Sequence, residues 1–296
     1  MSDVTAGEPL SERVIAIVGV GLIGGSIAAA LKGRNFAGEV VGVGRNSSRL
    51  EAARERGLIN RGSTDLEEVA RQADLLIFCT PVDLIAAGVR DAAGHCRPGT
   101  LITDAGSTKQ TICRELATGL PDGVQFIGSH PLAGSEKQGY EYAEADLFVG
   151  RLCVVTPDES SDPAALDRLV RFWRALGSEV TQLAPDAHDR IVARTSHLPH
   201  VVAAALASLL PESADRFAAS GFSDTTRIAS GDPALWTAIL LANAEEILAG
   251  LDEMSGTLQQ YRDTIAAGDR DGLHKRLELG KATRDRLINS NTDRKP

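Results

Sequence analysis

The sequence predicts an α/β protein with an N-terminal domain built on a parallel β-sheet and an all-helical C-terminal domain. Two patterns in its 296 residues indicate this class. Short apolar runs that suit buried strands alternate with helical stretches up to about residue 184, whereas only helical patterns continue beyond Pro185. We therefore expect two domains, at residues 1–184 and 185–296, and the chain is long enough to give them an ample core.

A glycine-rich turn joins the first expected strand, Val14–Val18, to the first helix. In the pattern GxGxxG the first glycine permits a tight turn, the second lets a pyrophosphate approach the backbone, and the third lets the helix lie close to its strand. The amides of the first helical turn then face the phosphates. The alternative is a purely structural strand–turn–helix. The residues expected to contact a dinucleotide here are Gly19, Gly21, Leu22, Ile23 and Gly24.

The end of the second expected strand, Val40–Gly44, indicates which dinucleotide binds. A Rossmann-type fold usually places an acidic residue there, about 20 residues after the glycines, to bind the adenosine ribose. This chain has Gly44, followed by Arg45 and Ser47. No carboxylate would repel a 2′-phosphate, and a guanidinium and a hydroxyl could bind one. We therefore expect NADP rather than NAD; the alternative is that Arg45 stacks on the adenine of either cofactor.

The rest of the N-terminal part continues the alternation of strands and helices. Thr80 and Pro81 follow one strand at the edge where open α/β sheets bind ligands, so both are expected to contact the cofactor. Strands are expected at 75–79, 100–104, 126–128, 151–156 and 179–183, and helices at 65–73, 84–93 and 163–176.

Long helical patterns fill the C-terminal part. They cover Asp186–Leu210, with a kink at Pro199, then Ala234–Ala266 and Leu273–Ile288. A helix as long as Ala234–Ala266 outruns what a small domain can cover, so we expect a homodimer. The alternative is an intramolecular bundle.

Composition excludes several classes of protein. A net charge of -9 and a pI near 5.2 argue against nucleic acid or an anionic membrane as a partner. The four cysteines lack metal-ligand spacing, so we expect reduced thiols and no metal. The polar, acidic N-terminus is unlike a signal peptide, and the longest apolar run, Val201–Leu210, is too short to cross a bilayer. The expected location is the cytoplasm.

Ser107 and His130 are the candidate catalytic residues, because each follows an expected strand at the edge where the nicotinamide should lie. A histidine there can accept a proton from a hydroxyl that undergoes hydride abstraction, since its unperturbed pKa of about 6.5 suits this task. A nearby serine can fix its tautomer or hold the substrate oxygen. A structural role in the expected loop 129–137 is the alternative for His130.

Ser196 and His200 are four residues apart in the first long helix and should share a face, where they could line a substrate pocket. His197 should point about 100° away, so the two histidines are not expected to serve one ligand. The alternative is a pair of buried core side chains.

Asp224 and Arg227 lie in a short glycine-containing segment between helices. Arg227 could bind a substrate carboxylate in a bidentate manner, with Asp224 orienting it. An exposed ion pair on a helix is the alternative.

Together these motifs resemble the prephenate/arogenate dehydrogenase family of tyrosine biosynthesis, and the likeness runs from Val14 to about Leu287. The motifs that carry it are GVGLIGGS (19–26), CTPV (79–82), DAGSTK (104–109), GSHPLAGSEKQG (128–139), SHLPH (196–200) and GFSDTTRIASGDPALW (221–236).

The resemblance implies oxidative decarboxylation of a cyclohexadienyl substrate, with hydride transfer from C4 of the ring to a nicotinamide and loss of the ring carboxylate as CO2. It implies that His130 takes the hydrogen bond or the proton of the C4 hydroxyl, with Ser107 beside it. It also implies that Arg227 holds the side-chain carboxylate. The other residues implied to form the substrate pocket are His200, Ser196, Asp224, Glu136 and Trp236.

Some residues indicate which substrate and which cofactor the family member uses. Glu136, Lys137 and Trp236 resemble prephenate-using members, whereas Gly44-Arg45 resembles NADP-using members, several of which take arogenate. We favour prephenate, with arogenate as the alternative. A β-hydroxyacid dehydrogenase would need a catalytic lysine, which the segment 196–200 lacks, and a non-catalytic NADP sensor is a third possibility.

Overall fold

The computed structural model describes residues 10–135 and 137–292. The chain forms two compact units, one that runs through Glu246 and one that begins at Ile247.

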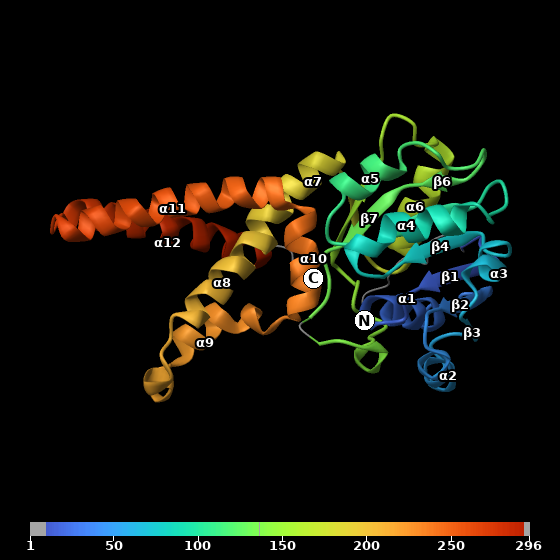
Figure 1. Ribbon diagram of the computed structural model, residues 1–296, viewed down its shortest axis with the longest axis horizontal. Coiled ribbons are helices and arrows are strands. Elements are labelled where there is room, and N and C mark those ends of the chain that lie inside the picture. Colours follow the sequence, from blue (N-terminus) through green and yellow to red (C-terminus); the bar gives the residue numbers. More distant parts are fainter. Residues whose placement is uncertain (1–9, 136, 293–296) are drawn as a thin grey trace. The chain divides into compact units, whose positions relative to one another are not determined.

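A six-stranded parallel sheet forms the centre of the first unit, in the order β3-β2-β1-β4-β5-β6 (Figure 1). From β1 the chain first moves outward to β3, then returns to the other side of β1 and moves outward to β6. The strand order therefore reverses between β1 and β4, which is where open α/β sheets bind ligands. The strands are β1 (Val14–Val18), β2 (Glu39–Val43), β3 (Arg61–Ser63), β4 (Leu75–Phe78), β5 (Leu101–Asp104) and β6 (Gln125–Phe126).

Helices cover both faces of this sheet and confirm the predicted fold class. Successive residues of β1 point to opposite faces. Ile15 and Ile17 pack in one core cluster with α1 and α6, and Ala16 packs in a second with α3, α4 and α5. The helices of this part are α1 (Leu22–Gly33), α2 (Ser47–Glu55), α3 (Leu66–Ala70), α4 (Val82–Ala93), α5 (Gln110–Leu116) and α6 (Pro163–Ala175).

A second sheet, in the order β7-β8-β9, carries His130. It consists of β7 (Gly128–Pro131), β8 (Leu152–Thr156) and β9 (Glu179–Gln182), with β7 antiparallel to β8. His130 pairs with Val154, so its expected position in a loop is wrong. The segment 126–128 is divided between two sheets, because β6 pairs with β5 and β7 pairs with β8.

α2, β3 and α5 are among the elements that were not expected from the sequence. α2 is largely polar, and only Leu50 and Ala53 are buried, so it shows little helical patterning. β3 has three residues and gains its strand geometry from pairing with β2. α5 begins at Gln110, whose amide donates to a carboxylate 79 residues later in the chain.

The expected helix Asp186–Leu210 is interrupted by a wide helical turn. It consists of α7 (Pro185–Val192), a π-helical segment (Ala193–His197) and α8 (Leu198–Ser208). Pro199 is the second residue of α8, separated from the π segment by Leu198, and lacks the amide that would continue a regular helix. The break is therefore a change of helical pitch before Pro199 rather than a simple kink at it.

The expected helix Ala234–Ala266 is two helices, α10 (Pro233–Ala242) and α11 (Ala244–Ala266), so its prediction as one helix is wrong. Between them lies the buried Asn243. Its Nδ2 donates to the carbonyl oxygen of Asp189 at 2.9 Å and contacts Nδ1 of His197 at 3.1 Å. These bonds to two other segments fix the break, and a single asparagine in a helical pattern does not reveal them. The short elements before α10 are two 3₁₀ helices, Glu212–Phe217 and Arg227–Ser230, with α9 (Ser220–Thr226) between them.

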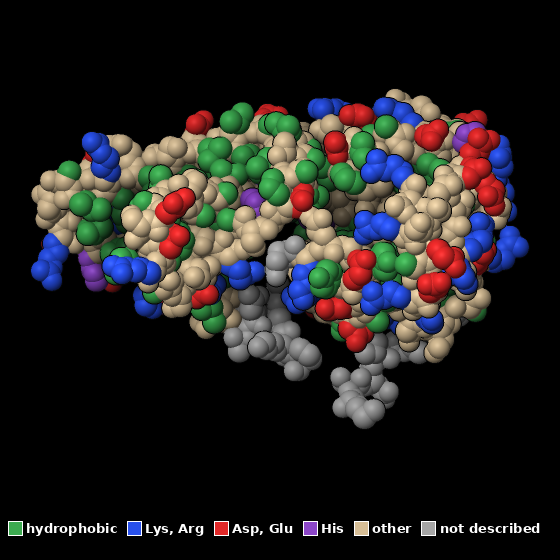
Figure 2. Space-filling model, turned by 60° about the horizontal axis from the view of Figure 1, so that its bottom comes forward, with side chains coloured by type: hydrophobic (Ala, Val, Ile, Leu, Met, Phe, Trp, Pro, Cys, Tyr) green, Lys and Arg blue, Asp and Glu red, His purple; other side chains and the backbone are tan. Residues whose placement is uncertain are grey.

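The second unit contains most of α11 and all of α12 (Arg270–Thr292). The guanidinium of Arg276 on α12 bonds Gln260 and Thr264 of α11. Both helices expose large apolar side chains, and Figure 2 shows hydrophobic side chains on the surface of the molecule. Among the described residues no single helix is long and apolar enough to cross a membrane, although α10 and α11 reach that length and composition as a bent pair. The exposed side chains of this unit include Leu248, Leu258, Ile265, Leu277 and Leu279.

Replacing Asn243 with alanine should lower the free energy of unfolding by about 1–3 kcal/mol, because it removes both of these contacts and leaves buried polar atoms without them. Urea unfolding measures this loss. Asn289→Ala, at an exposed position of α12, is the matched control and should change stability by less than about 0.5 kcal/mol. An Asn243→Ala protein as stable as its parent would contradict this account of the helix break.

Candidate active site

The glycine turn has the geometry of a dinucleotide site. Gly19 has a positive φ of 97°, and a Cβ there would lie 2.9 Å from the carbonyl oxygen of Cys79. A Cβ on Gly24 would collide with the carbonyl oxygen of Gly19, so the helix lies close to its strand. At Gly21, by contrast, a Cβ would meet no atom of the described residues within 4 Å. The space in front of this residue is open to a ligand.

The start of α1 is suited to an anion. Its first turn contains no acidic side chain, and Gly21 at its N-cap offers no side chain to bond the free amides. Nearby, the buried hydroxyl of Thr80 has no hydrogen-bond partner among the described residues. A polar ligand group could satisfy it. These residues therefore fit a bound dinucleotide.

Arginine side chains lie where the ribose of the adenosine would be expected. Arg45 and Ser47 are exposed after β2, and Asn46 caps α2 by accepting from the amide of Arg49 at 3.0 Å. The guanidinium groups of Arg49 and Arg56 each lie 5.8 Å from the centre of the Tyr140 ring. Sequence patterns did not indicate Arg56, which lies just after α2, because its contact with the Tyr140 ring depends on the fold.

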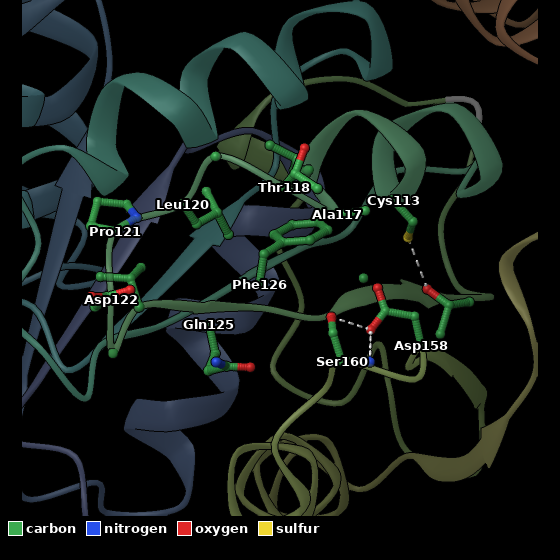
Figure 3. Close-up of a pocket in the computed structure, with 16 residues that line it drawn as sticks. Cys113, Ala117, Thr118, Leu120, Pro121, Asp122, Gln125, Phe126, Asp158 and Ser160 are labelled. Atoms are coloured by element: carbon green, nitrogen blue, oxygen red, sulfur yellow. Dashed lines mark hydrogen bonds between the residues drawn. The ribbon is translucent and has the colours of Figure 1, made fainter.

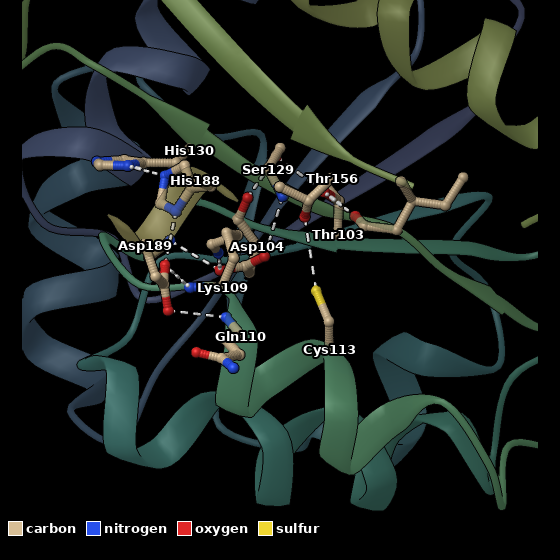
Figure 4. Close-up of polar contacts among 12 residues, drawn as sticks. Thr103, Asp104, Lys109, Gln110, Cys113, Ser129, His130, Thr156, His188 and Asp189 are labelled. Carbon is tan, nitrogen blue, oxygen red and sulfur yellow. Dashed lines mark hydrogen bonds and ion pairs between the residues drawn. The ribbon is translucent and has the colours of Figure 1, made fainter. Parts of the chain in front are cut away.

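His130 belongs to a chain of hydrogen-bonded side chains that the sequence did not indicate (Figure 4). Its Nδ1 lies 2.9 Å from Nε2 of His188, and Nδ1 of His188 lies 2.7 Å from Oδ1 of Asp189. His188 and Asp189 are buried on α7, 58 and 59 residues after His130. Their only sequence signal is a His-Asp pair in an expected helix.

Asp189 also holds the start of α5. Its Oδ1 accepts from the amide of Lys109 at 2.7 Å and its Oδ2 from the amide of Gln110 at 2.9 Å. The carboxylate thus binds two backbone amides of one segment and an imidazole of another. This is the kind of full hydrogen bonding that a buried carboxylate requires.

A buried ion pair between Lys109 and Asp104 supports the same region. Asp104, at the end of β5, accepts from the amides of Gly106 at 2.9 Å and Ser129 at 3.1 Å. It therefore connects the loop that contains Ser107 to the strand that contains His130 (Figure 4). Ser107 itself is half-buried.

Electrostatics keep His130 neutral. Burial of the imidazole, followed by the neighbouring His188, Lys109 and His197, holds its pKa well below the usual 6.5. A neutral imidazole near pH 7 can accept a proton. This is the state that a general base needs.

A second cluster surrounds Trp236. The His200 ring stacks on it with centroids 3.6 Å apart and planes at 13°, and His197 approaches it edge-on at 6.2 Å. Both histidines therefore contact one aromatic ring, although a regular helix would direct them apart. Burial lowers the pKa of His197 to about 4. Nδ1 of His200 is buried without a hydrogen-bond partner among the described residues, and a ligand could bond it.

The structure does not bring all the predicted residues together. Ser196 is exposed while His200 is buried, so they do not share an environment. Asp224 and Arg227 are exposed on α9 and the following 3₁₀ turn, and no ion pair joins them in the described part of the chain. Nor do the described residues show a contact between Arg227 and His130. Glu136 lies outside the described residues.

A separate pocket lies between α5, the segment 117–126 and the loop after β8 (Figure 3). Its lining includes Cys113, Phe126 and Asp158. None of the predicted site residues lines it. The candidate site is therefore the region around His130 and the glycine turn.

Two family models match this chain. "Prephenate dehydrogenase, nucleotide-binding domain" matches residues 27–182, and "Prephenate dehydrogenase, dimerization domain" matches residues 184–279. A prephenate dehydrogenase of Bacillus subtilis is 34% identical over 280 residues, which cover 92% of this chain and 76% of that protein.

Solved structures of prephenate and arogenate dehydrogenases are also similar to this chain. Prephenate dehydrogenase from A. aeolicus, in complex with hydroxyphenyl propionate and NAD+, is 31% identical with a TM-score of 0.88, covering 94% of this chain and 99% of that chain. Synechocystis arogenate dehydrogenase is 33% identical with a TM-score of 0.78, covering 93% of this chain and 99% of that chain.

The two helix-side glycines should respond differently to alanine. Gly21→Ala should keep its thermal stability, because the added methyl meets open space, yet weaken cofactor binding about tenfold or more by occupying the path of the pyrophosphate. Gly24→Ala should lower the melting temperature, because its methyl collides with the backbone of Gly19. Calorimetry and cofactor titration separate the two effects. Full cofactor affinity in Gly21→Ala would contradict the assignment of this turn.

Proposed function

Because the chain belongs to the prephenate dehydrogenase family, as its motifs indicated, we propose that it catalyses the oxidative decarboxylation of prephenate to 4-hydroxyphenylpyruvate. The chain is a nicotinamide-dependent oxidoreductase of this family. The observation that carries the proposal is the neutral, hydrogen-bonded imidazole of His130 in the same unit as an open glycine turn.

His130 is the proposed general base. Its Nε2 accepts the proton of the C4 hydroxyl as hydride leaves C4, and Ser107 holds the same oxygen. A nicotinamide bound at the glycine turn supplies the hydride acceptor. The electrons of the broken bond to the ring carboxylate enter the ring, which becomes aromatic as CO2 departs, and the resulting phenolate oxygen takes the proton back from Nε2 of His130. Because aromatisation drives the reaction, the protein has to align C4, take one proton and leave the departing carboxylate without strong neutralisation.

The helical segments are proposed to hold the rest of the substrate. Arg227 binds the side-chain carboxylate, and its exposure leaves the guanidinium free to bind an anion. His200 offers its buried Nδ1 beside Trp236. Ser196, Asp224 and Glu136 are proposed to complete the pocket, as the family resemblance implies.

NADP is the proposed cofactor in preference to NAD. Gly44 places no carboxylate at the end of β2, and the first turn of α2 has no acidic side chain. Arg45 and Ser47 are exposed at that helix start, where they could bind a 2′-phosphate.

Arogenate is the alternative substrate. It ends in an amino acid where prephenate ends in a keto acid, so one ammonium group distinguishes the two. The similarity to a Synechocystis arogenate dehydrogenase supports keeping it as a candidate.

A homodimer is also proposed. Support comes from the exposed leucines of α11 and α12 and from the match of residues 184–279 to a dimerization domain. We retain the proposed domain boundary near residue 184, which follows the end of β9 at Gln182.

Purified protein with NADP+ and prephenate should produce reduced cofactor, measured by absorbance, together with 4-hydroxyphenylpyruvate and CO2. Arogenate in its place tests the alternative, for which the product is tyrosine. His130→Asn should lower kcat about 10²-fold or more, because it removes the base.

Cofactor affinity and circular dichroism of His130→Asn should match the parent, since the substitution on β7 leaves the residues of the glycine turn unchanged. Unchanged turnover would assign the base elsewhere. No reaction with either substrate would favour a non-catalytic NADP sensor.

Arg45→Ala should weaken NADP+ binding about tenfold to a hundredfold and leave the Kd for NAD+ nearly unchanged, because it removes charge-assisted bonds to the 2′-phosphate only. Arg114→Ala, at an exposed position of α5, is the matched control. A parent protein with higher kcat/KM for NAD+ than for NADP+ would refute the cofactor preference.

A further inference from the structure

We propose that His188 and Asp189 are positioning residues that fix the tautomer of His130, so that Nε2 of that ring carries the lone pair. The proposal rests on the proposed function in treating His130 as the base. The ring arrangement itself follows from four hydrogen bonds.

Asp189 determines which atoms donate and which accept in this series of hydrogen bonds. This buried carboxylate already accepts from two backbone amides, at 2.7 and 2.9 Å, and it has no proton to donate. Nδ1 of His188, 2.7 Å from Oδ1, must therefore carry the proton of that bond.

The next contact follows from the first. A neutral imidazole with its proton on Nδ1 has a lone pair on Nε2. Nε2 of His188 therefore accepts from Nδ1 of His130 across 2.9 Å. With its own proton on Nδ1, His130 keeps an unprotonated Nε2, which is the atom that takes the substrate proton.

One added proton would reverse this arrangement. If His188 carried protons on both nitrogens, Nε2 would donate to His130 and the base would hold its proton on the wrong atom. An extra positive charge is disfavoured on His130 itself, because burial of its ring, followed by the neighbouring His188, Lys109 and His197, lowers its pKa. Asp104 neutralises Lys109, and Asp189 balances the charge that arrives during the reaction.

The same chain serves the imidazolium that forms in the reaction. The O–H bond of the C4 hydroxyl breaks, an N–H bond forms at Nε2 of His130, and the hydride carries its electron pair to the nicotinamide. Nδ1 of His130 continues to donate to His188. The new positive charge then lies two hydrogen bonds from the Asp189 carboxylate, which stabilises it.

The direct test is the tautomer of His130, read without substrate. Long-range proton–nitrogen correlation spectra of protein with ¹⁵N-labelled histidine distinguish protonated from unprotonated ring nitrogens. The signals of His130, one of six histidines, are assigned from their loss in His130→Asn. The expected result near pH 7.5 is a proton on Nδ1 and none on Nε2. A proton on Nε2 would overturn the proposal.

Variants test the consequence for catalysis. His188→Met removes the acceptor for Nδ1 and should lower kcat about 10- to 100-fold with KM and cofactor Kd nearly unchanged, whereas His188→Gln, whose carbonyl can accept, should lose less. Equal kcat in both variants and the parent would overturn the proposal.

Asp189→Asn tests the charge. In the parent, kcat/KM should be constant at neutral pH and should decrease on acidification, because the base is the neutral imidazole of His130. The midpoint of this decrease should lie below pH 6.5, because the pKa of His130 is lowered. Removing the carboxylate charge disfavours the imidazolium, so the midpoint should move to still lower pH while kcat falls. Asp186→Asn, an exposed residue of α7 paired with Arg190, is the control of equal charge change.

An Asp189→Asn protein with an unshifted midpoint would reduce Asp189 to its structural role at α5 and overturn this part. If a variant does not fold, the tautomer of His130 measured in the parent protein still tests the proposal. If His130 shows the expected tautomer but the protein converts neither prephenate nor arogenate, only the proposed function is contradicted. If the protein turns over substrate but His130 shows the opposite tautomer, only this inference is contradicted.

Discussion

The buried carboxylate of Asp189 is the group on which the site depends. Its oxygens bind the amides of Lys109 and Gln110 at the start of α5 and the ring of His188, while its main-chain carbonyl accepts from Asn243, between α10 and α11. A carboxylate removed from water is costly unless its partners are complete. Its surroundings satisfy this condition, and the same carboxylate bonds the ring of His188, which in turn contacts His130.

The protein is acidic overall, but the charged side chains that matter for the site lie in small local groups. Lys109 and Asp104 neutralise each other inside the fold, so the site contains a buried lysine without carrying a large uncompensated field. At the surface, charges of both signs are interspersed over the part of the molecule that contains the sheets (Figure 2). The exposed arginines near the start of α2 are therefore a local feature, suited to one anionic group rather than to a polyanion.

The features that could be predicted from the sequence are those that depend on residues close together along the chain. The glycine turn, the buried strands and the fold class follow from local pattern, and the motifs identified the family. His130 was singled out, but its strand was missed because β7 is defined by pairing with β8. His188 and Asp189 were missed because a histidine and an aspartate in a helix acquire a role only through contacts with segments more than 50 residues away. The break at Asn243 depends on similar distant bonds.

The π-helical turn between α7 and α8 lets two kinds of contact coexist on one continuous segment. α7 must direct His188 and Asp189 toward the sheets, while α8 must direct His200 against Trp236. The widened turn acts as a one-residue insertion absorbed within five residues. Winding the same residues at ordinary α-helical pitch would instead rotate everything downstream by about 100°, carrying the His200 ring off its aromatic partner. The wide pitch of this short stretch therefore sets the direction of His200 as much as residue identity does.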